Sequence, residues 1–184
     1  MFAIDPTLVR SLKRSEYDRM IELGLFDEER VELLQGVLVK MSPQLAPHAS
    51  TVSRLTELLV LRLAGRLGVR IQLPLALSDD SEPEPDVAVV ALGNYDAQHP
   101  ATALLVIEIA DSSLQKDRAK AAVYAAAGIR EYWIVNLSAR SIEVSLSPDG
   151  DRYAEVRTLR EGDVLRPIAL GDISIAVSEI LPPV

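Results

Sequence analysis

The sequence contains no cysteine and has few aromatic residues. Without cysteine the chain has no disulfide scaffold, no thiolate zinc site and no cysteine nucleophile. Aromatic residues make up only 4% of the 184 residues, so the core must be built mainly from Leu, Val, Ile and Ala. Since 48% of the residues are hydrophobic, this length and composition predict a single domain over residues 1–184 with a sizeable core.

Long apolar runs are missing as well. The N-terminal MFAIDPTLVRSLKR has no apolar stretch after its basic residues, which a secretory signal needs. No run approaches the roughly 18 apolar residues of a membrane-spanning helix. We therefore expect a soluble, cytoplasmic protein with no membrane partner.

Positive charge is also scarce. Lys and Arg total 19 against 27 Asp and Glu, which gives a formal net charge of −8. Nucleic-acid binders usually present a Lys/Arg face, because phosphate neutralisation and counterion release supply most of their non-specific affinity. The charge therefore argues against tight non-specific DNA binding, although a local basic patch can exist on an acidic protein.

Hydrophobic periodicity predicts alternating helices and strands. Three helices are expected. The first is short, is capped by Ser15 and ends at Gly24; the second is long, runs from Pro47 to about Leu67 and is ended by Gly68; the third covers 115–127 and is closed by Gly128. A tight turn is expected at Gln35-Gly36. Strands are expected on both sides of the tight turn within 31–41, over 71–77 with an interruption at Pro74, and over 87–92, 103–110, 131–137 and 141–147. The acidic, Pro-rich segment 78–86 should be an exposed loop, and the alternating apolar tail IALGDISIAVSEIL should pack last. This order predicts an α/β fold with a strand–helix–strand core.

Glu108 stands inside the most apolar predicted strand. It is flanked by Ile107 and Ile109, with no basic residue in the run. A buried, unpaired carboxylate costs several kcal/mol, so Glu108 needs a cation, a metal or several hydrogen-bond donors unless it points to water at a strand end. Strand alternation places it on the face of Val106 and Ala110.

Asp86 lies where the acidic loop becomes the next strand. Alone it is one more solvated acid, but the strand at 87–92 precedes the strand that carries Glu108. If the two strands are neighbours, both carboxylates converge on one hard cation. Mg²⁺ prefers oxygen ligands and is usually held by one or two carboxylates with waters and a substrate phosphate.

The arrangement of these motifs resembles a known family. EPDVAVV, then LLVIEIADSS and KDRAKAAVYAAAGIREYWIVN, closely resemble the Uma-two family of restriction-endonuclease-like proteins, which belongs to the PD-(D/E)XK nuclease superfamily. The resemblance begins near RSEYDRM, includes RVELLQGVLVKMSP, and covers nearly the whole chain. It implies a restriction-endonuclease-like mixed central sheet flanked by helices.

The resemblance also implies roles for particular residues. Asp86 and Glu108 match the two motif acids that bind the metal, Mg²⁺ with Mn²⁺ as the alternative, and the carbonyl of Ile109 matches the backbone metal ligand. Glu32 matches a family glutamate near the site and would accept from a metal-bound water. DNA is the implied substrate, cleaved by metal-assisted hydrolysis of a phosphodiester.

One position departs from the superfamily pattern. A lysine usually lies two residues after the second acid, where this chain has Ala110. The resemblance points instead to Lys120 on the following helix, and Asp117, Lys120 and Tyr124 share one helix face at i, i+3 and i+7. We predict that Lys120 reaches back to the carboxylate pair. Without that contact it would be an ordinary solvated lysine.

Two further questions stay open from the sequence. His48, at the start of the long helix, either caps that helix or contacts a phosphate. The chain is either a metal-dependent endonuclease or a catalytically degenerate nuclease-fold protein that binds DNA or a protein partner. A homodimer is expected, with IQLPLAL and the C-terminal apolar strand as candidate dimerisation edges.

Overall fold

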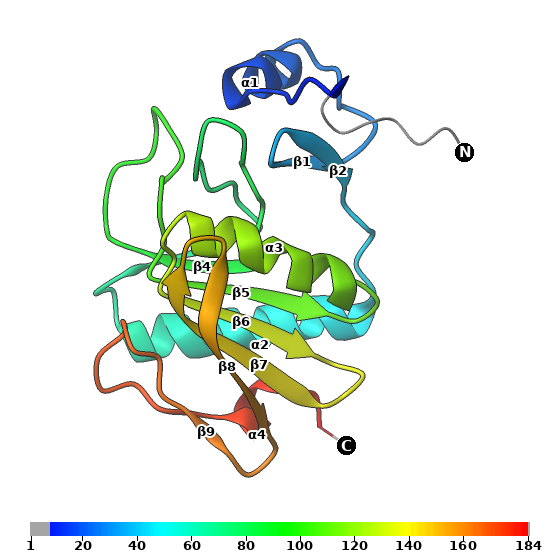
Figure 1. The fold of residues 1–184 in the computed structure, drawn as a ribbon. Helices are drawn as coiled ribbons and strands as arrows, with labels where there is room; N and C mark the ends of the chain where they lie inside the picture. Colours follow the sequence, from blue (N-terminus) through cyan, green and yellow to red (C-terminus); the bar gives the residue numbers. More distant parts are fainter. Residues whose placement is uncertain (1–7, 184) are drawn as a thin grey trace.

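A six-stranded mixed sheet with a long helix on each face forms the centre of the molecule (Figure 1). The computed structural model describes residues 8–183, so part of the N-terminal segment considered above lies outside the described residues. The strand order is β3-β4-β5-β6-β7-β8, in which β5 and β6 are parallel and the other neighbours antiparallel. The strands are β3 (Gly68–Ile71), β4 (Val87–Val90), β5 (Leu105–Ala110), β6 (Glu131–Asn136), β7 (Ser141–Asp149) and β8 (Arg152–Arg160). The predicted α/β class is confirmed.

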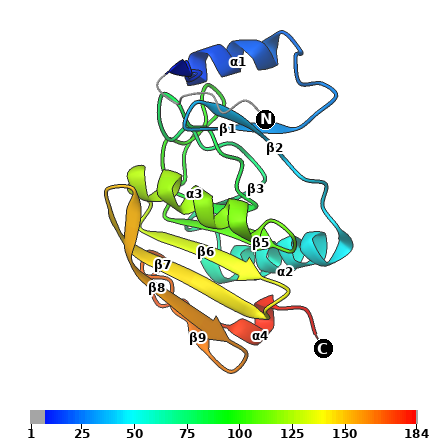
Figure 2. The ribbon, with the colours of Figure 1, turned by 45° about the vertical axis from the view of Figure 1, so that its right-hand side comes forward.

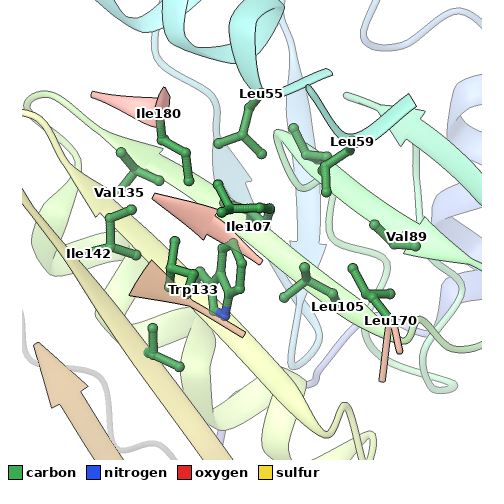
Figure 3. Close-up of a cluster of buried hydrophobic side chains, with 14 of the residues drawn as sticks. Leu55, Leu59, Val89, Leu105, Ile107, Trp133, Val135, Ile142, Leu170 and Ile180 are labelled. Atoms are coloured by element: carbon green, nitrogen blue, oxygen red, sulfur yellow. The ribbon is translucent and has the colours of Figure 1, made fainter. Parts of the chain in front are cut away.

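Strand alternation divides the core into two layers. In β5 the side chains of Leu105, Ile107 and Ile109 belong to one hydrophobic cluster, whereas Val106 and Ala110 belong to the other. The first cluster is covered by α2 (Ala46–Leu63), whose buried residues recur at helical spacing: Val52, Leu55, Leu59 and Leu63. Figure 3 shows Leu55 and Leu59 over the same layer as Ile107 and Trp133. Glu108 therefore points to the opposite face, away from α2.

The other face is covered by α3 (Leu114–Ala126), which connects the parallel strands β5 and β6. A parallel pair needs such a crossover, and its helix must begin close to the end of the first strand. Small alanines let α3 lie close to the sheet, and Gly128 follows the helix with a φ of 71°, as predicted from its C-cap signal. The turns of α3 nearest its start are thus held over the end of β5.

An N-terminal unit lies against the loop that precedes β4. It consists of α1 (Arg14–Glu22) and a hairpin of β1 (Val31–Leu34) and β2 (Val37–Lys40), seen at one end of the molecule in Figures 1 and 2. Gln35 and Gly36 both have positive φ, as the predicted tight turn requires. The N–H of Glu82 donates to the carbonyl of Leu33 at 2.8 Å, which joins the hairpin to the loop.

The C-terminal segment closes the face that α2 covers. It contains β9 (Val164–Leu165), β10 (Ile175–Ala176) and α4 (Val177–Ile180). Its apolar residues Ile173, Ile175, Val177 and Ile180 join the cluster beneath α2, so the alternating tail packs on the core as expected. Within residues 8–183, no helix has the length and apolar character needed to cross a membrane.

Several predicted boundaries are wrong. Lys13, not Ser15, is the N-cap of α1. Helix α2 ends at Leu63 because Ala64 and Gly65 adopt the left-handed conformation, and Gly68 begins β3 instead of ending the helix. The strand expected over 71–77 is displaced to 68–71, since the chain leaves the sheet after Ile71 and the N–H groups of Leu75 and Ala76 donate to loop carbonyls.

Two tertiary effects were also missed. The acidic loop over 78–86 is exposed only at residues 78–80, because the hairpin covers the rest and buries Ser81 and Glu82. Strand β8 was not predicted, because its apolar residues are interleaved with Arg and Glu and most of its side chains are exposed. Burial of the loop follows from contacts between segments that are distant in sequence, whereas β8 forms a hairpin with β7, the strand just before it.

Candidate active site

Asp86 and Glu108 lie opposite each other at the end of the β4–β5 pair. The register pairs Val87 with Ile107 and Ala88 with Val106, and the same register extended by one residue places Asp86 opposite Glu108. Directly opposite residues of an antiparallel pair project their side chains from the same face. The assumption that these two strands are neighbours is therefore correct, and the two acids share the face covered by α3.

Each acid also accepts a hydrogen bond from the backbone of the other strand. The N–H of Asp86 donates to Glu108 Oε2 at 3.3 Å, and the N–H of Ile109 donates to Asp86 Oδ2 at 2.8 Å. Strand β4 pairs with β5 only as far as Ile107. Beyond that point the backbone N–H of Ile109 donates to the Asp86 side chain and not to the backbone of β4. The two carboxylates are thereby fixed next to each other where β4 begins.

Lys120 and Tyr124 of α3 hold the other oxygen of Glu108. Lys120 Nζ lies 2.6 Å from Glu108 Oε1, and the Tyr124 hydroxyl donates to the same oxygen at 2.8 Å. Both side chains are buried, at 2% and 0% exposure. The prediction that Lys120 reaches back to the carboxylate pair is confirmed, and Glu108 has the cation and the donors that its burial demands.

Glu32 completes an ion network around Lys120. Its Oε2 lies 2.8 Å from Lys120 Nζ, and its Oε1 lies 3.4 Å from Lys116 Nζ. The backbone N–H of Glu84 also donates to Glu32. Since Glu32 is fully buried on β1, the hairpin carries it into the interior. One buried ammonium therefore lies between two buried carboxylates.

The surroundings shift the pKa of both partners upward. Burial raises the pKa of Glu108 and the charges of Asp86 and Asp117 add to the rise, so the pKa is about 8 even though Lys120 lowers it. Burial by itself lowers the pKa of Lys120, but the carboxylates of Glu108 and Glu32 raise it above its ordinary value. Lys120 thus stays charged at neutral pH, whereas burial disfavours the ionised form of Glu108.

His48 and Gln72 hold Asp86. His48 Nε2 lies 3.0 Å from Asp86 Oδ2, and the side-chain amide of Gln72 donates to Oδ1 at 3.2 Å. Burial raises the pKa of Asp86, but the hydrogen bond and charge of His48 outweigh it and lower the pKa overall. Burial lowers the pKa of His48, while Asp86 raises it above its ordinary value. The capping interpretation of His48 is wrong, because Leu45 is the N-cap of α2 and the ring bonds to Asp86.

These groups open onto one pocket. It has a volume of about 70 Å³ and lies between the segment 41–45 and the start of α3. Asp86, Glu108, Lys120 and Asp117 line its floor, and Lys116 lines its wall. Asp117 is buried, which raises its pKa, and its carboxylate accepts from the Ser113 hydroxyl. Across residues 8–183 no group of three or more His, Asp or Glu side chains is arranged to hold a metal on its own.

The structure thus brings Asp86, Glu108, Lys120 and Glu32 together, with the backbone of Ile109 beside them. Three contributors were not assigned a site role from the sequence: Gln72 and Tyr124, and the bond of His48 to Asp86. Tyr124 had a signal, since it shares the helix face of Lys120. Gln72 had none, because it reaches Asp86 only through the turn that follows β3.

The fold is that of a nuclease-like α/β protein. A structure from Anabaena variabilis, described as a putative nuclease belonging to DUF820, matches with a TM-score of 0.73 and 14% sequence identity, covering 89% of this chain and 95% of that one. The chain belongs to the Uma2 family, described as "Putative restriction endonuclease", whose model matches residues 14–178. A search of curated proteins gave no match.

Proposed function

We propose that the protein is a metal-dependent endonuclease that hydrolyses DNA phosphodiester bonds. The observation that carries the proposal is the pairing of Asp86 and Glu108 at the end of two central strands, with the Lys120 ammonium 2.6 Å from Glu108. The family and the nuclease-like fold support DNA as the substrate. A homodimer is part of the proposal, since within residues 8–183 the sheet ends in a long strand, β8, that pairs on one side only.

The donor set fits Mg²⁺, with Mn²⁺ as the alternative. Asp86 and Glu108 supply hard carboxylate oxygens. Glu108 Oε1 already accepts from Lys120 and Tyr124, whereas Oε2 accepts one long hydrogen bond at 3.3 Å and is the oxygen available to a metal. The N–H and C=O of a strand residue point to the same side, so the Ile109 carbonyl faces the side on which its N–H meets Asp86. Two carboxylates and a carbonyl suit a cation that keeps several waters.

The protein's own groups would position and stabilise the reacting atoms. A bound ion would polarise a phosphate oxygen and lower the pKa of a bound water. Lys120 would orient the attacking water and offset charge that develops at phosphorus. Glu32 would hold Lys120 in place, and His48 with Gln72 would keep the Asp86 carboxylate turned toward Glu108.

A nuclease assay tests the proposal directly. Purified protein with Mg²⁺ or Mn²⁺ is incubated with supercoiled, linear duplex and single-stranded DNA, next to Glu108→Ala under the same conditions. We expect cleavage by the wild type that EDTA stops, and none by the variant. No cleavage of any substrate by a folded, metal-binding wild type would favour a degenerate nuclease-fold protein that binds DNA or a protein partner.

Tyr124→Phe should weaken Mg²⁺ binding without unfolding the protein. The change removes one donor to Glu108 Oε1, so the carboxylate loses part of its fixed orientation. Partners that orient a metal ligand typically contribute about 10- to 100-fold in affinity. Calorimetric titration of the metal-free protein with Mg²⁺ measures the loss.

Tyr132→Phe is the matched control for this substitution. Its hydroxyl is equally buried and packs in the same cluster, but it donates to the backbone carbonyl of Asp117 at 2.7 Å. Both variants should lose a similar amount of unfolding free energy, about 1–2 kcal/mol. Equal losses of Mg²⁺ affinity in the two variants would contradict an orienting role for Tyr124.

A further inference from the structure

The outer edge of β8 is the longest unpaired strand edge in the part of the chain that the structure describes. Eight of the nine residues of β8 pair with β7 on one side, and the strand order of the sheet ends there. In Figures 1 and 2 it forms the margin of the sheet, next to β7. Unpaired N–H and C=O groups along an edge are a template for another strand. The opposite edge, β3, offers only four residues.

The usual means of blocking an edge are weak in β8. The strand contains no proline, and its centre is Val156, which is 61% exposed. It does carry charges, which often prevent pairing between edges. Their order decides whether they repel or attract a second copy: Glu155 and Arg157 flank Val156 symmetrically with opposite signs.

We propose that β8 pairs antiparallel with β8 of a second copy, about a two-fold axis at Val156. In this register Glu155 lies directly opposite Arg157 of the second copy, and Arg157 opposite its Glu155. Opposite charges at directly opposed positions stabilise an antiparallel pair. The two six-stranded sheets would then form one continuous sheet across the axis.

The charges also disfavour the two adjacent registers. A shift of the axis to residue 155 would place Glu155 opposite itself, and a shift to 157 would do the same to Arg157. Like charges directly opposite are destabilising, so neither shift competes. Arg152 and Arg160 face each other only at the exposed strand ends, where the pairing frays.

The edges considered from the sequence are less suited. Residues 72–77 of IQLPLAL are not in a strand, so they offer no ladder of hydrogen bonds. In the C-terminal segment β10 has two residues and already pairs with β9. The dimer surface is therefore assigned to β8, and it does not depend on nuclease activity.

Two charge-reversal variants test the assignment. The chain has a mass of 20.1 kDa, and sedimentation of the wild type should give twice that value. Glu155→Arg alone and Arg157→Glu alone each place two like-charge pairs across the axis. Each should therefore raise the dissociation constant by about 3- to 30-fold, because two cross-strand contacts are reversed in each dimer.

An equimolar mixture of the two variants is the decisive control. Glu155→Arg opposite Arg157→Glu restores both unlike pairs, so the mixture should form heterodimers about as tightly as the wild type forms homodimers. Since Glu155 and Arg157 also contact each other within the strand, a purely local effect would persist in the mixture. Circular dichroism confirms that each variant is folded.

Hydrogen exchange on the wild type gives a second measurement that needs no variant. Amides on the outer edge of β8 should exchange more slowly as the protein concentration rises. A wild type that stays monomeric overturns the proposal, and so does a dimer whose affinity neither substitution changes. Protection of β8 that is independent of concentration would overturn it as well.

Discussion

Lys120→Met is expected to abolish cleavage and to destabilise the protein, because the same ammonium serves both functions. Turnover should fall by about 100-fold or more, as when a group that stabilises the transition state is lost. Removal of the shared cation leaves Glu32 and Glu108 as buried acids without their partner. Breaking a buried ion pair on one side costs about 3–5 kcal/mol of unfolding free energy. Chemical denaturation and a DNA cleavage assay measure the two effects.

Two controls separate the functions of Lys120. Lys116→Met removes a neighbouring cation that is 29% exposed and 3.4 Å from Glu32, so the unfolding free energy should change by less than about 1 kcal/mol. Glu32→Gln combined with Lys120→Met removes one of the two stranded charges. This double variant should recover part of the lost stability and none of the activity. Cleavage that returns with stability would mean that Lys120 is only structural.

Glu108→Gln is expected to abolish Mg²⁺ binding with little change in the stability of the metal-free protein. Burial already raises the pKa of Glu108 to about 8, so its ionised form is unfavourable in the folded state. The amide oxygen can still accept from Tyr124, and Lys120 keeps Glu32 as its counter-ion. We expect the unfolding free energy to change by less than about 1 kcal/mol. A large loss in thermal melts without Mg²⁺ would identify Glu108 as a structural partner instead.

The pH dependence of stability gives this variant a second readout. Because the folded-state pKa is raised, the contribution of Glu108 is fully present below its unfolded pKa of about 4.3. It is lost as the pH rises through about 8. With EDTA present, the unfolding free energy of the wild type should therefore decline across this window relative to that of Glu108→Gln. Parallel profiles of the two proteins would contradict the raised pKa.

Local periodicity predicted the orientation of Glu108 and of Lys120, whereas the pairing of Asp86 with Glu108 rested on the assumption that their strands are neighbours. Alternation along β5 placed Glu108 on the face of Val106 and Ala110, and helical spacing placed Lys120 and Tyr124 on one face of α3. The short connection from β5 to α3 then limited how far Lys120 could be from Glu108. The family resemblance identified which of these polar residues to single out.

Other features depended on packing between distant segments. Glu32 reaches Lys120 because the hairpin folds over the loop before β4. Gln72 reaches Asp86 from the turn after β3, and His48 reaches it from α2. Burial of residues 81–83 in the acidic loop and the pKa of Glu108 have the same origin. Periodicity reports which face of its own element a residue occupies, but not which other element covers that face. The sequence by itself therefore determined the α/β class and singled out Asp86, Glu108 and Lys120. Only the tertiary structure decided which residues surround these three side chains, because burial and charge coupling arise when separate segments pack together.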